Sequence, residues 1–303
     1  MTDQIPDFAP IGVVGLGNMG IEIAQRLNAA FPVIATDLSP ERRTVAETAG
    51  LEVADLDVIV GRAKTVLLSL PHPKASLAVA QTIAVTPGSV QVVLESSTVT
   101  PKDILQIKTL LAVAGVETLD AAILSGVAQM HNGTAGIVIA GDKGQVARLG
   151  TLFDAITPHQ RILDKSGTAM AAKVINNAVA HVVMVLLSEA IAMAHATGLD
   201  PQQVVELLQA PDGGLMRPLT HRIAERVFDG AYDGGMALEA ARKDSVLAQQ
   251  LAQDVGLPIF TIPAAHTVYE LAMAEGWARE DYAALTKLWE QWGHTSFVSG
   301  PAE

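Results

Sequence analysis

The sequence predicts an α/β domain with a doubly wound, mainly parallel sheet, followed by an all-helical domain. Short apolar runs alternate with helical segments through the first half of the chain, and strand signals disappear after Gly167. A length of 303 residues also exceeds what one hydrophobic core usually fills. We therefore expect one domain at residues 1–165 and a second at 166–303, joined by a long helix.

The first predicted strand, at residues 11–15, runs directly into a glycine-rich turn. The turn reads Gly15-Leu16-Gly17-Asn18-Met19-Gly20, and a helix to about residue 30 follows it. A second strand at residues 32–36 ends at Asp37. This order of strand, glycine turn, helix, strand and acid is the dinucleotide-binding fingerprint of Rossmann-type domains. We predict that the turn and Asp37 bind a dinucleotide, with its phosphates at the helix N-terminus.

Asp37 also bears on which dinucleotide binds. A carboxylate at this position accepts hydrogen bonds from a ribose diol and repels a 2′-phosphate, which favours NAD over NADP. Ser39 and Pro40 predict a helix start, and Arg42 and Arg43 lie in its first turn. These two arginines are either an exposed helix face or contacts for a 2′-phosphate, so NADP stays the alternative.

The later strands of the first domain end in loops that should share one edge of the sheet. A strand at residues 64–70 ends at Leu70-Pro71, and one at 90–94 leads into Ser97-Thr98. Because open α/β sheets bind ligands at the carboxyl ends of their strands, these four residues are candidate cofactor contacts. His72 follows Pro71 and is read as a loop residue rather than a base. Further strands are expected at residues 116–119, 134–140 and 160–163.

The second domain opens on a helix from about residue 166 to 196. This helix holds Lys173 in a segment of alanine, valine, leucine and methionine, with Asn176 and Asn177 on the same side. The lysine either extends its head to solvent or has partners that tune its pKa. More helices are expected at residues 201–210, 217–228, 236–255, 261–276 and 281–292. Lys173 should then lie where the two domains meet, a preferred place for ligands.

Charge and composition exclude several classes of protein. The net charge of −12 argues against nucleic acid and anionic membranes as partners. The absence of cysteine excludes disulfides, thiol catalysis and cysteine metal sites, and no metal site is predicted. Residues 1–10 have no secretory signal, and the apolar run at 178–187 is too short to span a bilayer. We expect a cytoplasmic protein.

Four motifs in chain order resemble the β-hydroxyacid dehydrogenases, which include 3-hydroxyisobutyrate dehydrogenase, tartronate semialdehyde reductase and the 6-phosphogluconate dehydrogenases. The motifs are the glycine turn, the Ser125-Gly126 loop, the Lys173 helix and Lys243-Asp244, and the resemblance covers about residues 11 to 292. It implies that Lys173 is the general acid/base. It further implies substrate binding by Ser125, Gly126, Asn176 and Asn177, and cofactor contacts by Ser97, Thr98 and Lys243.

One loop departs from the family pattern. The family usually reads Asp-Ala-Pro-Val-Ser-Gly-Gly, whereas this chain reads Asp120-Ala-Ala-Ile-Leu-Ser-Gly126. Aligned without a gap, the family's serine becomes Leu124; with a gap, Ser125 and Gly126 match and the second glycine is missing. In both alignments the loop that binds the substrate carboxylate has changed.

The resemblance implies reversible hydride transfer between NAD and a small anionic 3-hydroxy acid, or its oxo form, by a homodimer or homotetramer. Two alternatives stay open. An imine reductase-like enzyme shares this architecture but usually lacks the lysine, and a dinucleotide-binding protein without catalysis is the third interpretation. Lys173 and Asp37 together favour the dehydrogenase.

Overall fold

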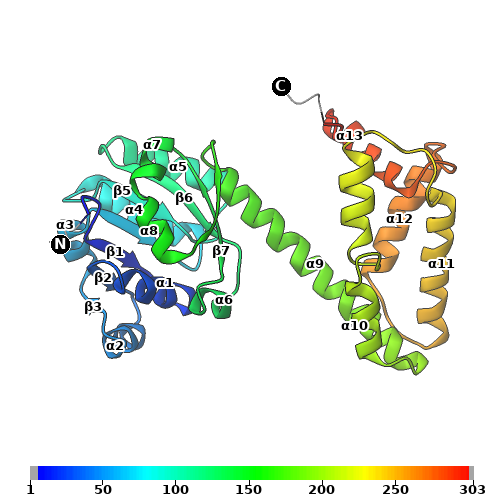
Figure 1. Cartoon of the computed structure of the whole chain (residues 1–303), viewed down its shortest axis with the longest axis horizontal. Coiled ribbons are helices and arrows are strands. Elements are labelled where there is room, and N and C mark those ends of the chain that lie inside the picture. The colour runs from blue at the N-terminus through cyan, green and yellow to red at the C-terminus, as the bar shows by residue number, and fades with distance from the viewer. Residues whose placement is uncertain (1–5, 300–303) are drawn as a thin grey trace. The chain divides into compact units, whose positions relative to one another are not determined.

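The computed structural model describes residues 6–299. The chain divides into two compact units, Met1–Ala178 and Val179–Glu303, with the division inside one long helix (Figure 1). Residues 1–5, part of the segment in which we expect no secretory signal, lie outside the described residues. Each unit is described by itself below.

The first unit is built on an eight-stranded sheet of order β3-β2-β1-β4-β5-β6-β7-β8. Every neighbouring pair is parallel except β6–β7, so the predicted doubly wound, mainly parallel sheet is confirmed. The short edge strand β3 was not predicted, because two residues carry no alternating pattern. The strands are β1 (Ile11–Val14), β2 (Val33–Thr36), β3 (Glu52–Val53), β4 (Thr65–Leu68), β5 (Val92–Glu95), β6 (Glu117–Ile123), β7 (Gly136–Ala140) and β8 (His159–Leu163).

Helices cover both faces of this sheet (Figure 1). On one face α1, α6 and α8 bury residues such as Ile23, Met130 and Phe153 against the strands. On the other face α3, α4 and α5 bury Ile59, Ile83 and their neighbours. The helices are α1 (Asn18–Asn28), α2 (Pro40–Thr48), α3 (Leu56–Arg62), α4 (Pro73–Val85), α5 (Pro101–Ala112), α6 (Val127–His131), α7 (Lys143–Arg148) and α8 (Gly150–Ile156).

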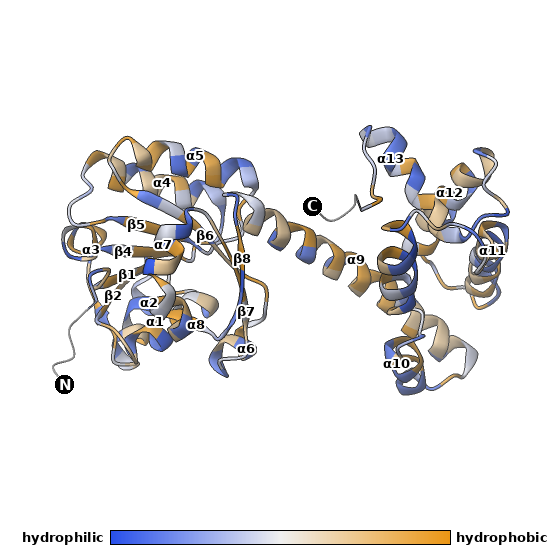
Figure 2. Cartoon of the chain, turned by 45° about the horizontal axis from the view of Figure 1, so that its top comes forward, coloured by the Kyte–Doolittle hydropathy of each residue, from blue (hydrophilic) through white to orange (hydrophobic). Residues whose placement is uncertain are grey.

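The long helix α9 (Thr168–Thr197) begins in the first unit and continues into the second. Figure 2 colours most of it in the hydrophobic range, and residues 174–188 carry no charged side chain. Over 18 residues its mean hydropathy is 1.7 with 11% of that window buried, so length and composition alone would allow α9 to cross a membrane. The ten-residue run at 178–187 therefore underestimates the apolar length of this helix, because the polar residues that directly flank it in α9 are uncharged.

The second unit continues as helices, which confirms the predicted helical half of the chain. Gly198 has the positive φ of a helix-ending glycine, and the Asp200 side chain caps the next helix, as predicted. The elements after α9 are α10 (Pro201–Gln209), the π-helix η1 (Pro218–Val227), α11 (Leu238–Asp254), α12 (Thr261–Ala274), the 3-10 helix η2 (Tyr282–Thr286) and α13 (Lys287–Gly293).

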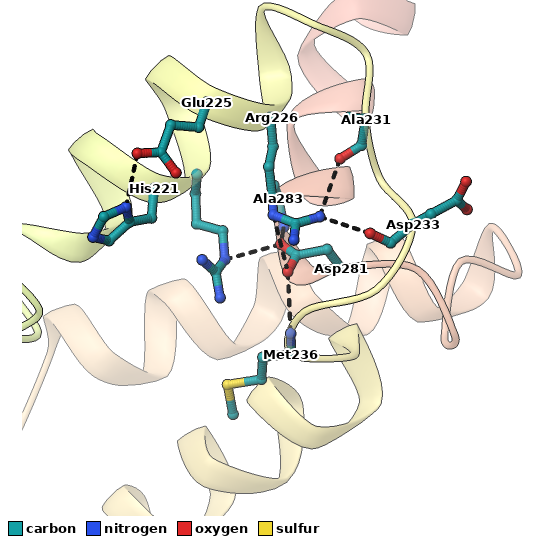
Figure 3. A network of polar contacts seen from close by, with 9 residues as sticks. His221, Glu225, Arg226, Ala231, Asp233, Met236, Asp281 and Ala283 are labelled. Atoms are coloured by element: carbon teal, nitrogen blue, oxygen red, sulfur yellow. Dashed lines mark hydrogen bonds and ion pairs between the residues drawn. The ribbon is translucent and has the colours of Figure 1, made fainter.

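Two buried carboxylates hold this second unit together. Asp281 is fully buried, lies 3.0 Å from Arg222 Nε, and accepts the backbone amides of Met236 and Ala283 (Figure 3). Glu189 of α9 accepts the amides of Phe260 and Thr261 at 2.7 and 2.8 Å, which caps the start of α12. Asp281 thereby holds the Ala283 amide in the first turn of η2, and Glu189 holds two amides at the start of α12, which would otherwise lack partners.

Candidate active site

The glycine turn has the backbone that a dinucleotide requires. Gly15 has φ +99°, and a Cβ there would lie 2.2 Å from the Ser69 carbonyl oxygen. A Cβ on Gly20 would lie 2.0 Å from the Gly15 carbonyl oxygen, so α1 packs directly on the turn. Gly17, the N-cap of α1, faces open space and has no side-chain cap. Its neighbourhood therefore leaves room and free amides for a pyrophosphate, and the residues present fit the cofactor.

Asp37 lies at the end of β2 and organises the same turn. Its Oδ2 accepts the Leu16 amide at 2.6 Å, and its Oδ1 accepts the Ser39 amide at 2.8 Å. A carboxylate oxygen accepts more than one hydrogen bond, so both interactions leave capacity for a ribose diol. Arg42 donates to Asn18 Oδ1 at 3.0 Å, so it joins α2 to the glycine turn rather than standing free on the helix face.

The loops after β4 and β5 are joined by one serine. The Leu70 amide donates to Ser97 Oγ at 2.8 Å, and the Ser97 amide donates to Glu95 Oε1 at 2.8 Å. Thr98 is exposed beside this network, whereas His72 is an exposed N-cap of α4, as expected for a loop residue. The predicted cofactor residues of these loops thus lie on one connected edge of the sheet.

Lys173 lies above that edge, with only 8% of its surface exposed. Its Nζ donates to the Ser96 carbonyl oxygen at 2.8 Å, so the interpretation of a lysine that extends to solvent is wrong. Burial lowers the pKa of Lys173 to about 8, although the nearby Glu95 carboxylate acts in the opposite direction. A lysine with a pKa near neutrality can both give and take a proton at working pH.

Sequence reasoning missed two buried acids on the strands beneath the start of α9. Glu95 and Asp120 end up as register partners on β5 and β6, and both are fully buried. Burial raises the pKa of Glu95, and it raises the pKa of Asp120 to about 6. The available signal in the sequence was an acid at the end of an apolar strand for Glu95 and inside a strand for Asp120, since a buried acid needs partners.

The altered loop after β6 is part of the fold. Ser125 Oγ accepts the Gly136 amide at 2.8 Å, and Leu124 packs against the small core cluster at the start of α9. Gly126 is the N-cap of α6 without a side-chain cap. Substrate binding by Ser125 and Gly126 stays a prediction, with the Ser125 hydroxyl proton still free to be donated.

The remaining predicted site residues are Asn176 and Asn177 on α9, which make no hydrogen bond to the glycine turn among residues 6–299, and Lys243 on α11. Asn176 donates to Asn177 Oδ1 at 3.4 Å, and the described residues show no hydrogen bond from either amide to Lys173. Lys243 belongs to α11 of the second unit, where its exposed side chain pairs with Asp244 at 3.1 Å. The cofactor contact of Lys243 stays a prediction. Within residues 6–299, no group of three or more histidine or acidic side chains is placed to hold a metal ion.

A Rossmann-type domain followed by a lysine-bearing helix and a helical domain defines an NAD-binding oxidoreductase. Residues 10–163 match the family described as the NAD binding domain of 6-phosphogluconate dehydrogenase. Residues 167–289 match the family described as NAD-binding of NADP-dependent 3-hydroxyisobutyrate dehydrogenase. The chain belongs to the β-hydroxyacid dehydrogenase family.

Curated relatives agree with this assignment over nearly the whole chain. Mitochondrial 3-hydroxyisobutyrate dehydrogenase of Rattus norvegicus is 26% identical over 91% of this chain and 85% of its own length. The 2-(hydroxymethyl)glutarate dehydrogenase of Eubacterium barkeri is 25% identical over 96% and 98%. NAD-dependent L-serine dehydrogenase of Pseudomonas aeruginosa is 28% identical over 92% and 97%.

Solved structures extend the likeness to the fold. An imine reductase from Pseudomonas sp. superposes with a TM-score of 0.83 at 18% identity, covering 91% of this chain and 98% of that one. An imine reductase variant from Myxococcus stipitatus, in complex with NAD+, has a TM-score of 0.82 at 15% identity, covering 92% and 98%. At these identities the likeness concerns the fold alone.

Proposed function

We propose that this protein transfers a hydride reversibly between NAD and the hydroxyl-bearing carbon of a small anionic 3-hydroxy acid. The observation that carries the proposal is Lys173, a buried lysine with a pKa of about 8 on the edge that holds the glycine turn. The bound nicotinamide supplies the redox chemistry. The chain supplies the binding groups, the orientation of the substrate and a proton acceptor.

Lys173 Nζ is the atom that takes the proton. In oxidation the neutral amine accepts the hydroxyl proton as the hydride leaves the same carbon. In reduction the ammonium donates that proton to the new alkoxide oxygen. The Ser96 carbonyl, 2.8 Å from Nζ, orients the lysine in both directions. Ser125, the Gly126 amide and Asn177 are the groups we assign to the substrate carboxylate and hydroxyl.

Asp37 is the residue we assign to cofactor choice. Its two oxygens already hold the Leu16 and Ser39 amides, so the carboxylate stands fixed where an adenosine ribose would arrive. A 2′-phosphate at that place meets a fixed negative charge, which supports NAD over NADP.

The proposal is tested by a reduction screen with NAD and NADP over 3-hydroxy acids and four-carbon sugar acids. Lys173→Ala should lose about 10²–10⁴-fold in turnover while NAD binding survives. Lys165→Ala, an exposed lysine eight positions earlier, is the matched control and should keep full turnover. Activity on cyclic imines with none on hydroxy acids would replace the proposal by an imine reductase. NAD binding without any turnover would replace it by a non-catalytic dinucleotide-binding protein.

A second copy of this chain is the partner we propose for α9. Ile175, Val179 and Val182 form a stripe at helical spacing and are each 58–64% exposed, in a stretch without charge. Val182→Glu should convert a dimer or tetramer into a monomer, measured by light scattering. Val85→Glu changes a valine of α4 that is also exposed and should leave the oligomer intact. A monomeric parent protein, or one that partitions into lipid vesicles, would overturn this assignment.

A further inference from the structure

Asp120 is a buried acid that the proposed reaction does not use. It lies on β6 with no exposed surface, and its Oδ2 accepts the Gly167 amide at 2.7 Å. Its Oδ1 has no hydrogen-bond partner among residues 6–299. Because burying a carboxylate is costly, this position requires a reason beyond filling the core.

The group that Asp120 holds is the start of the lysine helix. Gly167 directly precedes α9 and has φ +91°, a backbone that other residues rarely adopt. The next turn buries Ala169 and Met170 completely in the small cluster formed with β6, β7 and α5. The Asp120 carboxylate therefore lies where amides with no partner inside the helix point toward the sheet.

The same turn determines where Lys173 lies. The lysine follows Gly167 by less than two helical turns, and its Nζ reaches the Ser96 carbonyl beyond the end of β5. Glu95, which ends β5, is the register partner of Asp120 on β6. The position of the lysine is thus fixed by two adjacent strands. Its Nζ contacts the residue that follows β5, and the start of its helix contacts β6.

We propose that Asp120 is a positioning residue for Lys173, because its carboxylate fixes the first turn of α9 on β6 and thereby sets the reach of the lysine. The inference rests on the proposed function for its kinetic consequence only. The contact between β6 and α9 is independent of which substrate the protein takes.

The charged groups around Asp120 come from two elements. Glu95 is its register partner on β5, and the Lys108 charge acts on it from α5. Burial raises the pKa of Asp120 to about 6, while the amides of Gly167 and Met170 and the Lys108 charge hold it from rising further. The carboxylate is therefore ionised at pH 7.5 and becomes protonated as the pH falls through about 6.

Protonation should weaken the anchor, since hydrogen bonds to an ionised acceptor are about twice as strong as neutral ones. Turnover should then fall on the acid side with a midpoint near pH 6. In the reductive direction the alkaline limit is Lys173 itself, near pH 8, so activity should be confined between these two values. The contribution of Asp120 to stability has the opposite pH dependence. Because folding raises the pKa of this acid, its ionised form destabilises the folded state, and this penalty disappears as the pH falls below about 6.

Asp120→Asn tests the proposal, with Glu117→Gln on the exposed end of the same strand as the matched control. The asparagine keeps the shape and an acceptor for Gly167 but has no charge at any pH. We expect turnover at pH 7.5 to be about 10-fold lower than in the parent protein. The fall in turnover with a midpoint near pH 6 should be absent. Amide exchange in residues 166–173 should be faster, and the melting temperature at pH 7.5 equal or higher. The control should match the parent protein in all four measurements.

A second measurement needs no substrate. Lysines are labelled by reductive methylation with ¹³C, and the Lys173 signal, assigned by its absence in Lys173→Ala, is titrated by NMR. In Asp120→Asn the Lys173 pKa should move up from about 8, because a loosened first turn returns the amine toward water. The inference would be overturned if Asp120→Asn kept the acid-side pH profile of turnover, the amide exchange rates of residues 166–173 and the Lys173 titration of the parent protein. A parent protein without hydroxy acid turnover would overturn the proposed function, while exchange and titration would still decide the role of Asp120.

Discussion

Replacing Lys173 with methionine should make the protein more stable and less active at once. Folding lowers the pKa of this lysine from 10.5 to about 8 because the side chain is buried. Each pKa unit corresponds to about 1.4 kcal/mol, so at pH 7 the folded state carries a penalty on the order of 3 kcal/mol for the buried ammonium. Methionine has a similar length and no charge, so Lys173→Met removes that penalty.

The pH dependence isolates this effect from other consequences of the substitution. Between pH 8 and 10.5 the unfolded chain binds more protons than the folded protein, so the stability of the parent protein rises with pH in that window. The advantage of Lys173→Met should therefore shrink by about 2 kcal/mol between pH 7 and pH 9.5. Equilibrium urea denaturation at the two pH values measures the difference.

The outcome that refutes this reasoning is an advantage that stays the same at both pH values, or a loss of stability at pH 7. Lys165→Met serves as the control because Lys165 is exposed, and its effect should not vary with pH. Turnover of Lys173→Met should fall about 10²–10⁴-fold. Stability and activity that change in opposite directions are the mark of a functional buried charge rather than a structural one.

Two further substitutions test the cofactor residue and the cap of the second unit. Asp37→Ala should weaken NAD binding and relax discrimination against NADP, because it removes a fixed charge; an unchanged ratio of the two dissociation constants in fluorescence titrations would contradict this. Glu189→Gln should lower the unfolding free energy at pH 7 by about 1–2 kcal/mol, because the Phe260 and Thr261 amides lose a charged acceptor. Burial acts to raise the pKa of Glu189, but these amides outweigh it and lower the pKa, so the carboxylate stabilises the protein above pH 4.5. The stability difference between Glu189→Gln and the parent protein should vanish as the acid becomes protonated. A difference that persists in acid would refute the assignment.

The sequence predicted the parts of the fold that local patterns control. The turn from Gly15 to Gly20 sets backbone geometry through the residues themselves, and the helix start at Ser39 was recognisable from the Ser39-Pro40 pair alone. Helices of the second unit also followed, because their apolar period of about 3.6 residues extends over several turns.

The environment of Lys173 could not be predicted in the same way. Glu95, Asp120 and Lys173 are brought together by strand order and by the packing of α9, and no spacing in the chain reports either. The sequence left open whether Lys173 extends to solvent or has partners, and it offered only Asn176 and Asn177 as neighbours, because spacing along one helix was the only geometry at hand. The observed partner is the Ser96 carbonyl on another element.

The glycine turn offers a test that separates folding from cofactor binding at neighbouring positions. A Cβ on Gly20 would lie 2.0 Å from the Gly15 carbonyl oxygen, which is backbone and cannot rotate away. Gly20→Ala should therefore push α1 from the turn and lower the unfolding free energy by about 1–3 kcal/mol. A Cβ on Gly17 meets no protein atom within 4 Å, and its φ of −62° suits any residue.

Gly17→Ala should consequently fold with a stability within about 1 kcal/mol of the parent protein. The new methyl group would instead occupy the space through which a pyrophosphate reaches the amides at the start of α1. We expect its dissociation constant for NAD, measured by calorimetry, to rise at least ~10-fold, since losing even one charge-assisted hydrogen bond has that effect. If Gly17→Ala bound NAD as tightly as the parent protein, the phosphates would not lie on this turn. The assignment of the cofactor to the open space above Gly17 would then be wrong, even though the fold around it stands.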